Sequence, residues 1–137
     1  MRKSRIISSG RYLPPRVVTN FDLTKYMETS DEWIQQRTGI VERHWVDEGV
    51  GTSGLGVEAA KAALKKANMD IKDIDFMIFA TLSPDYTMPG SGVLVQEKLG
   101  GPTIGALDVR NQCSGFIYSL SIADQFIRTG TYDHVLV

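Results

Sequence analysis

The residue best suited to covalent chemistry is Cys113, the only cysteine of the chain, which lies in the stretch RNQCSGF at 110–116. An apolar run, IGALDV, precedes it, and a run with helical periodicity follows. A cysteine at such a turn lies near a helix N-terminus, where unpaired N–H groups and the helix dipole favour the reactive thiolate and can stabilise an oxyanion. A lone cysteine is more often buried and inert. The position alone leaves both interpretations open, and the polar neighbours slightly favour a reactive thiol.

A second pair of residues could bind a nucleotide. Trp33 and Arg37 are spaced i, i+4 and therefore share one face of a short helix. An aromatic ring beside a guanidinium suits a stacked base next to phosphates. On spacing alone, a cation–π pair on the surface or a tryptophan in the core is the favoured interpretation.

A glycine pattern gives a competing hypothesis. The stretch GVGTSG at 49–54 matches G-x-G-x-x-G, and Asp75 follows about 20 residues later, as in dinucleotide-binding folds. The run before it, ERHWVDE, is polar where a buried strand is required, so a glycine-rich loop that leads into a helix is favoured. His44 and His134 lack ligand partners, and we expect no metal site.

The first 50 residues carry short elements. We expect a strand over 5–10 (RIISSG) and a proline-marked loop over 12–20 (YLPPRVVTN). We expect a strand or hairpin arm over 40–46 (IVERHWV). TSDEWIQQRTG predicts a helix with Thr29 as N-cap, Glu32 completing a capping box, and Gly39 at its end.

The remainder alternates between helices and apolar strands. Helices are expected over 52–68, 91–99 and 114–129, and buried strands over 75–83, 103–109 and 134–137. This order predicts an α/β fold with a largely parallel sheet covered by helices on both faces. The last run begins a strand that no further helix covers, so we expect residues 1–137 to be an incomplete part of a longer α/β protein.

The composition is that of an ordinary soluble protein. Hydrophobic residues make up 42%, charged residues 23%, and the net charge is −1. These values argue against disorder and give no sign of nucleic-acid binding. No apolar run is long enough for a signal peptide or membrane span. A cytoplasmic location is therefore expected by default, and the single cysteine, which cannot form an internal disulfide, fits a reducing compartment.

Two long motifs resemble a known family. TSDEWIQQRTGIVERHW (29–45) and DVRNQCSGFIYSLSIADQFIRTGTYDHVLV (108–137) are similar to the N-terminal part of beta-ketoacyl-acyl carrier protein synthase III, in the thiolase superfamily. The resemblance implies that residues 1–137 form an incomplete N-terminal thiolase-like half-domain with a mixed, mainly parallel sheet. It implies an acyltransferase that initiates fatty-acid or polyketide-like synthesis. The implied partners are acyl-CoA, acyl carrier protein, and a second copy of the chain or a complementing C-terminal half, with no tightly bound cofactor and no metal.

The resemblance also assigns residues. Cys113 matches the nucleophile that accepts the acyl group. Trp33 matches the residue that stacks on the CoA adenine, and Arg37 and Thr29 match further residues that contact CoA. Met88, in YTMPGS, matches a residue that closes the partner's acyl pocket. The family's catalytic His and Asn lie in its second half, so we expect this chain alone to be acylated but unable to condense.

Several alternatives stay open at this point. Hydroxymethylglutaryl-CoA synthase and long-chain head-to-head condensing enzymes share the family's fold and cysteine. A non-catalytic fragment, or a nucleotide-binding module that uses the glycine loop, is a further possibility. Arg110, Asn111 and Gln112 stand where the family often has small residues, which leaves the starter acyl chain open.

Overall fold

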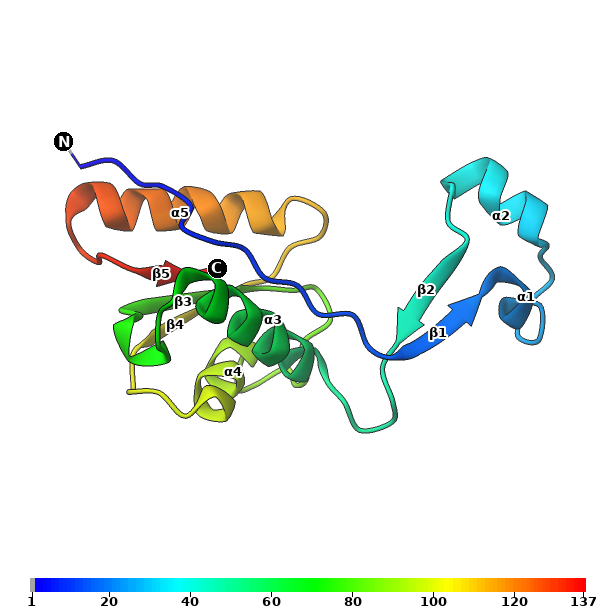
Figure 1. Cartoon of the computed structure of the whole chain (residues 1–137), viewed down its shortest axis with the longest axis horizontal. Helices are drawn as coiled ribbons and strands as arrows, with labels where there is room; N and C mark the ends of the chain where they lie inside the picture. The colour runs from blue at the N-terminus through cyan, green and yellow to red at the C-terminus, as the bar shows by residue number, and fades with distance from the viewer. Residues whose placement is uncertain (1) are drawn as a thin grey trace. The chain divides into compact units, whose positions relative to one another are not determined.

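The computed structural model describes residues 2–137, which form two compact units (Figure 1). The larger unit comprises residues 2–12 and 51–137, and the smaller unit spans Leu13–Val50. Cys113 belongs to the larger unit, whereas Trp33 and Arg37 belong to the smaller one.

The larger unit is built around a three-stranded sheet of order β4-β3-β5. Both pairs of neighbouring strands are parallel, with Phe76 opposite Gly105 and Val135. The fold class is therefore α/β, as the sequence predicts, and each helix and strand expected after residue 50 is present. In chain order the elements are α3 (Thr52–Ala67), the 3-10 helix η1 (Ile71–Asp73), β3 (Phe76–Ala80), α4 (Ser91–Leu99), β4 (Gly105–Val109), α5 (Gly115–Thr129) and β5 (Val135–Leu136).

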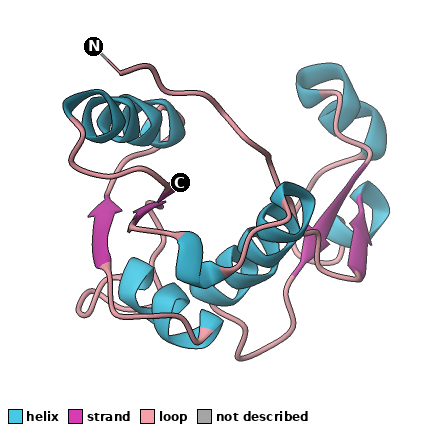
Figure 2. Cartoon of the chain, turned by 60° about the vertical axis from the view of Figure 1, so that its left-hand side comes forward, coloured by secondary structure: helices cyan, strands magenta, loops and turns pink. Residues whose placement is uncertain are grey.

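Helices cover both faces of this sheet (Figures 1 and 2). Successive side chains of a strand point to opposite faces. Met77 of β3 is buried with Val57 of α3 and Val95 of α4. Its neighbour Phe76 meets Phe126 of α5, with ring centroids 4.9 Å apart. Thus α3 and α4 pack on one face and α5 on the other, which confirms the predicted layers.

The longest described helix, α3, is amphipathic rather than apolar throughout. Val57, Ala60 and Leu64 are buried along one side, and Glu58 pairs with Lys61 on the exposed side at 2.8 Å. Among residues 2–137, no helix has the length and apolar character needed to cross a membrane.

The strand predicted over 5–10 is not formed. These residues are extended but pair with no strand. Instead the segment is held by helices, because the Ser4 hydroxyl donates to Asp124 of α5 at 2.5 Å and the Ser8 hydroxyl to the Ala63 carbonyl of α3 at 2.8 Å. Gly10 lies against the backbone of α3 at Ala63, where a Cβ would overlap main-chain atoms. Glycine is therefore required for this close approach.

The smaller unit is an antiparallel pair of strands connected by a segment that holds two helices. Its strands β1 (Arg16–Thr19) and β2 (Glu42–Trp45) pair from Arg16 opposite Trp45 to Thr19 opposite Glu42. The helices are α1 (Asn20–Leu23) and α2 (Asp31–Thr38). Of the two alternatives predicted over 40–46, a strand or a hairpin arm, the strand is confirmed, because two helices separate β2 from its partner β1 along the chain. The predicted loop at 12–20 is wrong for its RVVT portion. The prolines end before this portion, and its two valines suit a strand.

Candidate active site

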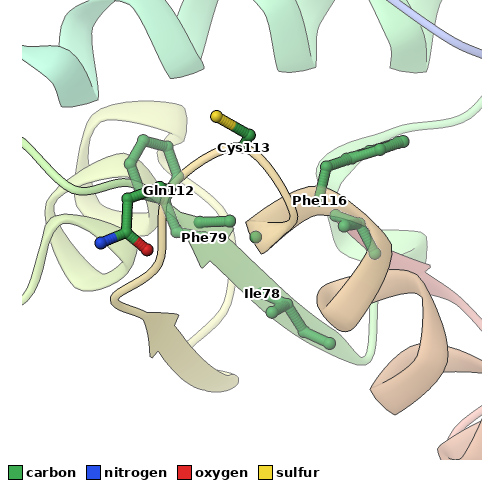
Figure 3. A pocket seen from close by; sticks show the side chains of 8 residues that line it. Ile78, Phe79, Gln112, Cys113 and Phe116 are labelled. Carbon is green, nitrogen blue, oxygen red and sulfur yellow. The ribbon is translucent and has the colours of Figure 1, made fainter.

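Cys113 lies on the turn between β4 and α5, as the sequence predicts (Figure 3). Its thiol is free and the residue is exposed, so the interpretation as a buried core cysteine is wrong. The turn borders a cavity of about 330 Å³. In the view of Figure 3, Cys113 lies between Phe79 and Phe116. The cavity is lined by Ile78, Phe79, Ala80, Gln112, Cys113, Gly115, Phe116 and Val137.

Polar residues shape the turn. The Asn111 side chain accepts from the N–H of Gln112 at 2.8 Å, and the Gln112 carbonyl accepts from the N–H of Gly115 at 3.0 Å. Ser114 is the N-cap of α5 and makes no side-chain capping bond. Within residues 2–137, the backbone N–H of Cys113 makes no hydrogen bond. The turn therefore offers a donor beside the thiol.

The surroundings of the thiol suit acyl transfer. A nucleophile, a free N–H donor and an apolar cavity are the groups that an acyl-thioester intermediate needs. The cavity walls come from β3 and from the first turn of α5, so the strand and helix patterns that surround Cys113 in the sequence also build its cavity.

Met88 is not brought to this cavity. It lies in the loop between β3 and α4, where 87% of its surface is exposed, and it does not line the space beside Cys113. Within the described part of the chain, Met88 and Cys113 thus belong to one unit without sharing a pocket.

Trp33 and Arg37 pair on the surface of α2. The Arg37 guanidinium lies 4.7 Å from the centre of the Trp33 ring, and Trp33 is 53% exposed. The alternative of a core tryptophan is wrong, because Ile34 is the residue of α2 that is buried. An exposed indole beside a cation leaves room for a flat anionic ligand.

Thr29 is not the N-cap of this helix. Ser30 takes that position and accepts from the N–H of Trp33 at 3.1 Å. The hydroxyl oxygen of Thr29 is covered by protein atoms and has no hydrogen-bond partner. The predicted capping box with Glu32 is therefore wrong, since the cap lies one residue later. A ligand could reach the Thr29 oxygen only if its cover moved.

The smaller unit contains a buried amide that the sequence analysis missed. Asn20 is fully buried. Its amide nitrogen donates to Asp31 and to the Ile40 carbonyl, both at 2.8 Å, and its oxygen accepts from Arg43 at 2.6 Å. Hydrogen bonds from Gln35 and then Asn20 lower the pKa of Asp31. Asn20 thus connects the start of α2 to the paired strands β1 and β2. No local sequence pattern identifies this role, because the hydrogen-bond partners of Asn20 are distant in sequence.

The glycine loop leads into a helix end that is already capped. The carboxylate of Asp85 accepts from the N–H and hydroxyl of Ser53 in α3, both at 2.9 Å, and from the Ser91 hydroxyl at 2.8 Å. Burial alone would raise the pKa of Asp85, but the bonds from Ser91 and Ser53 outweigh it and lower the pKa. Gly51 allows this approach, because a Cβ would overlap the Asp85 carboxylate. A phosphate would have to displace Asp85, which argues against the dinucleotide hypothesis.

The other candidates have structural partners. Asp75 accepts from the N–H groups of Asp133 and His134, at 2.9 and 2.8 Å, and thereby fixes the start of β5. His44 bonds the Pro14 carbonyl through Nδ1. In the described range, no group of three or more His, Cys, Asp or Glu side chains could hold a metal ion.

Comparison with known proteins adds to this geometry. The family model for 3-oxoacyl-[acyl-carrier-protein] synthase III matches residues 107–137, which include the cysteine turn. The chain is 49% identical over 132 residues to a beta-ketoacyl-[acyl-carrier-protein] synthase III of Caldanaerobacter subterraneus subsp. tengcongensis, an alignment that covers 96% of this chain and 40% of that protein. It is 50% identical over 139 residues to the same-named protein of Thiobacillus denitrificans, covering 100% of this chain and 43% of that one.

A solved structure shares the fold. The crystal structure of 3-oxoacyl-[acyl-carrier-protein] synthase III from Aquifex aeolicus superposes with a TM-score of 0.90 at 45% identity, covering 98% of this chain and 43% of the other. The chain thus spans about two fifths of the length of the curated relatives it matches.

Proposed function

We propose that this chain, which is similar to beta-ketoacyl-[acyl-carrier-protein] synthase III over about two fifths of that protein's length, forms the acyl-accepting part of such a condensing enzyme. The observation that carries the proposal is the exposed thiol of Cys113 at the start of α5, beside an apolar cavity. The enzyme class of the homologues is condensing acyltransferase.

Cys113 would act as the nucleophile. Its thiolate attacks the carbonyl carbon of an acyl-CoA thioester, a new sulfur–carbon bond forms, and CoA leaves as a thiolate that takes up the proton lost by the cysteine. The negative charge on the carbonyl oxygen needs a donor while the intermediate lasts. The unbonded N–H of Cys113 supports such a role, and the cavity beside it suits the acyl chain.

Trp33 and Arg37 would contact the adenine nucleotide of CoA. The exposed indole suits stacking with the base, and the guanidinium suits phosphate. Thr29 is proposed as a further CoA contact on the family resemblance alone, because its hydroxyl is covered.

The second step would be a condensation. Malonyl-acyl carrier protein loses CO2, the resulting carbanion attacks the acyl carbon on Cys113, and the Cys113 thiolate leaves, which yields 3-oxoacyl-acyl carrier protein. The His and Asn that the family uses here have no counterpart in residues 1–137. We therefore propose that this step requires a complementing C-terminal half, and that the working form is a dimer in which Met88 of one subunit closes the acyl pocket of its partner.

Mass spectrometry of the intact chain after incubation with acetyl-CoA tests the first step. We expect one acetyl group on the chain, located on the peptide that contains Cys113, and none on Cys113→Ala. The Ser114→Ala variant is the matched control, since it changes a neighbour without removing the thiol. An unmodified chain, both alone and after mixing with a complementing C-terminal half, would refute the proposal and favour a non-catalytic fragment.

A shortened acyl donor tests the nucleotide contact separately. Acetyl-pantetheine carries the same thioester as acetyl-CoA but lacks the adenine nucleotide. Loss of base stacking costs about 1–3 kcal/mol, so Trp33→Ala should slow acylation by acetyl-CoA roughly 5- to 160-fold below saturation. The same variant should leave the rate with acetyl-pantetheine unchanged. Equal losses with both donors would contradict the assignment of Trp33.

A further inference from the structure

The loop between β3 and α4, residues 81–90, is held at both ends but not in its middle. At its start the N–H of Thr81 donates to the Val109 carbonyl at 3.1 Å. Nearer α4 the N–H of Asp85 donates to the Ser91 hydroxyl at 3.1 Å, in addition to the capping bonds of the Asp85 carboxylate. Residues 86–89, here called the loop tip, lie between these anchors.

One side chain bonds the loop tip. Nη2 of Arg110 donates to the carbonyl of Thr87 at 3.0 Å and to that of Tyr86 at 3.4 Å. Within residues 2–137 these are the only hydrogen bonds that hold residues 86–88. Their side chains are open to solvent, with Tyr86 61% and Met88 87% exposed. The position of the tip therefore depends on Arg110.

Arg110 also belongs to the cysteine turn. It is the first residue after β4 and precedes Cys113 by three positions. A planar guanidinium with two hydrogens on one nitrogen can serve two consecutive carbonyls, which a small side chain cannot do. The bonds thus connect the segment that carries Met88 to the segment that carries the nucleophile.

We propose that Arg110 is a positioning residue that holds the Met88 segment in register with the Cys113 turn and so restricts which acyl chains the enzyme accepts. The proposal rests on the proposed function, in which Met88 of one subunit closes the acyl pocket of its partner. Without the tether the loop tip samples more conformations, and a pocket closed by a mobile methionine admits longer chains.

Limited proteolysis of the full chain tests the tether without any substrate. Chymotrypsin cleaves after Tyr86, whose carbonyl is one that Arg110 binds, and after Tyr26 in the smaller unit, which is 65% exposed and serves as the internal reference. Each net hydrogen bond corresponds to about 2- to 10-fold in population. Arg110→Ala should raise the ratio of cleavage at Tyr86 to cleavage at Tyr26 by about that factor, and Arg110→Lys by less. An unchanged ratio in Arg110→Ala would overturn the tether.

Arg11→Ala is the matched control, because Arg11 is exposed, lies in the larger unit and, within residues 2–137, makes no hydrogen bond to the loop. It should leave the cleavage ratio unchanged. An equal rise in Arg11→Ala would assign the effect to general loosening and overturn the tether. Should Arg110→Ala fail to fold, Arg110→Lys decides the question by the same ratio.

The specificity claim is tested by rates of Cys113 acylation with acetyl-, butyryl- and octanoyl-CoA. Arg110→Ala should raise the octanoyl-to-acetyl rate ratio about 2- to 10-fold, with Arg110→Lys between it and the unchanged chain. Uniform slowing with all three donors would overturn the specificity claim. If the unchanged chain reacts with none of them, the proposed function and the specificity claim both fail, while the cleavage ratio still decides the tether.

Discussion

The buried amide of Asn20 gives the sharpest test of how the smaller unit holds α2. Replacement by alanine removes the bonds to Asp31, to the Ile40 carbonyl and to Arg43 at a site with no solvent exposure. At about 0.5–1.5 kcal/mol of net stability for each bond, the loss is about 2–4 kcal/mol. The Ile40 carbonyl also loses its partner, whereas the Arg43 guanidinium keeps its bond to the Val18 carbonyl at 3.2 Å.

Tryptophan fluorescence in urea measures this loss. Both tryptophans of the chain, Trp33 and Trp45, lie in the smaller unit. Their emission therefore reports the unfolding of the smaller unit, whereas far-UV circular dichroism reports the unfolding of both units. We expect Asn20→Ala to lower the free energy of unfolding from fluorescence by about 2–4 kcal/mol. If Trp33 binds CoA as proposed, affinity for CoA should fall in parallel.

The matched control is Gln35→Ala, which also removes a bond to Asp31, at 2.7 Å, but from an exposed position. Exposed substitutions of this kind change stability by about 0.5 kcal/mol or less. If Asn20→Ala costs no more than Gln35→Ala, the amide does not fix α2, and the reasoning from burial and hydrogen bonding is wrong.

Three further predictions concern the larger unit. Since the pKa of Asp85 is lowered from 3.8 by its bonds to Ser91 and Ser53, its stabilisation is present above about pH 4 and is lost as pH falls through the folded-state value. Urea unfolding at about pH 6 and pH 3 should therefore show a smaller acid loss in Asp85→Asn, and equal losses would contradict the cap. Gly10→Ala should destabilise the chain by about 1–3 kcal/mol, because its Cβ overlaps the backbone of α3; an unchanged midpoint in urea would refute this contact. The outer edges of β4 and β5 have no partner strand within residues 2–137, so copies of the chain should associate with one another or with a complementing chain. A molar mass of one chain by light scattering would count against this prediction.

Local patterns accounted for the elements of the larger unit. The helix over Thr52–Ala67 follows a 3.6-residue period, and the apolar runs at Phe76–Ala80 and Gly105–Val109 form parallel strands, of which only the first has fully buried residues. The turn that holds Cys113 was predictable for the same reason, since a strand pattern and a helix pattern bracket it. Three local predictions were wrong: the strand at 5–10, the loop over the residues of β1, and the capping box of Thr29 with Glu32. The first two concern segments whose state depends on a partner far along the chain, and in the third the cap lies one residue later, at Ser30.

The sequence by itself determined that the chain is α/β, that its one thiol lies at a strand-to-helix turn, and that Trp33 and Arg37 share a helix face, because each of these depends on residues within a few positions of one another. Only the tertiary structure decided that the thiol is exposed beside a cavity, that Asp85 closes the helix end after the glycine loop, and that Arg110 reaches the segment of Met88. The hydrogen bonds of Asp85 and Arg110 join residues 23 to 32 positions apart. Hydrogen bonds over such separations leave no periodic trace in a sequence.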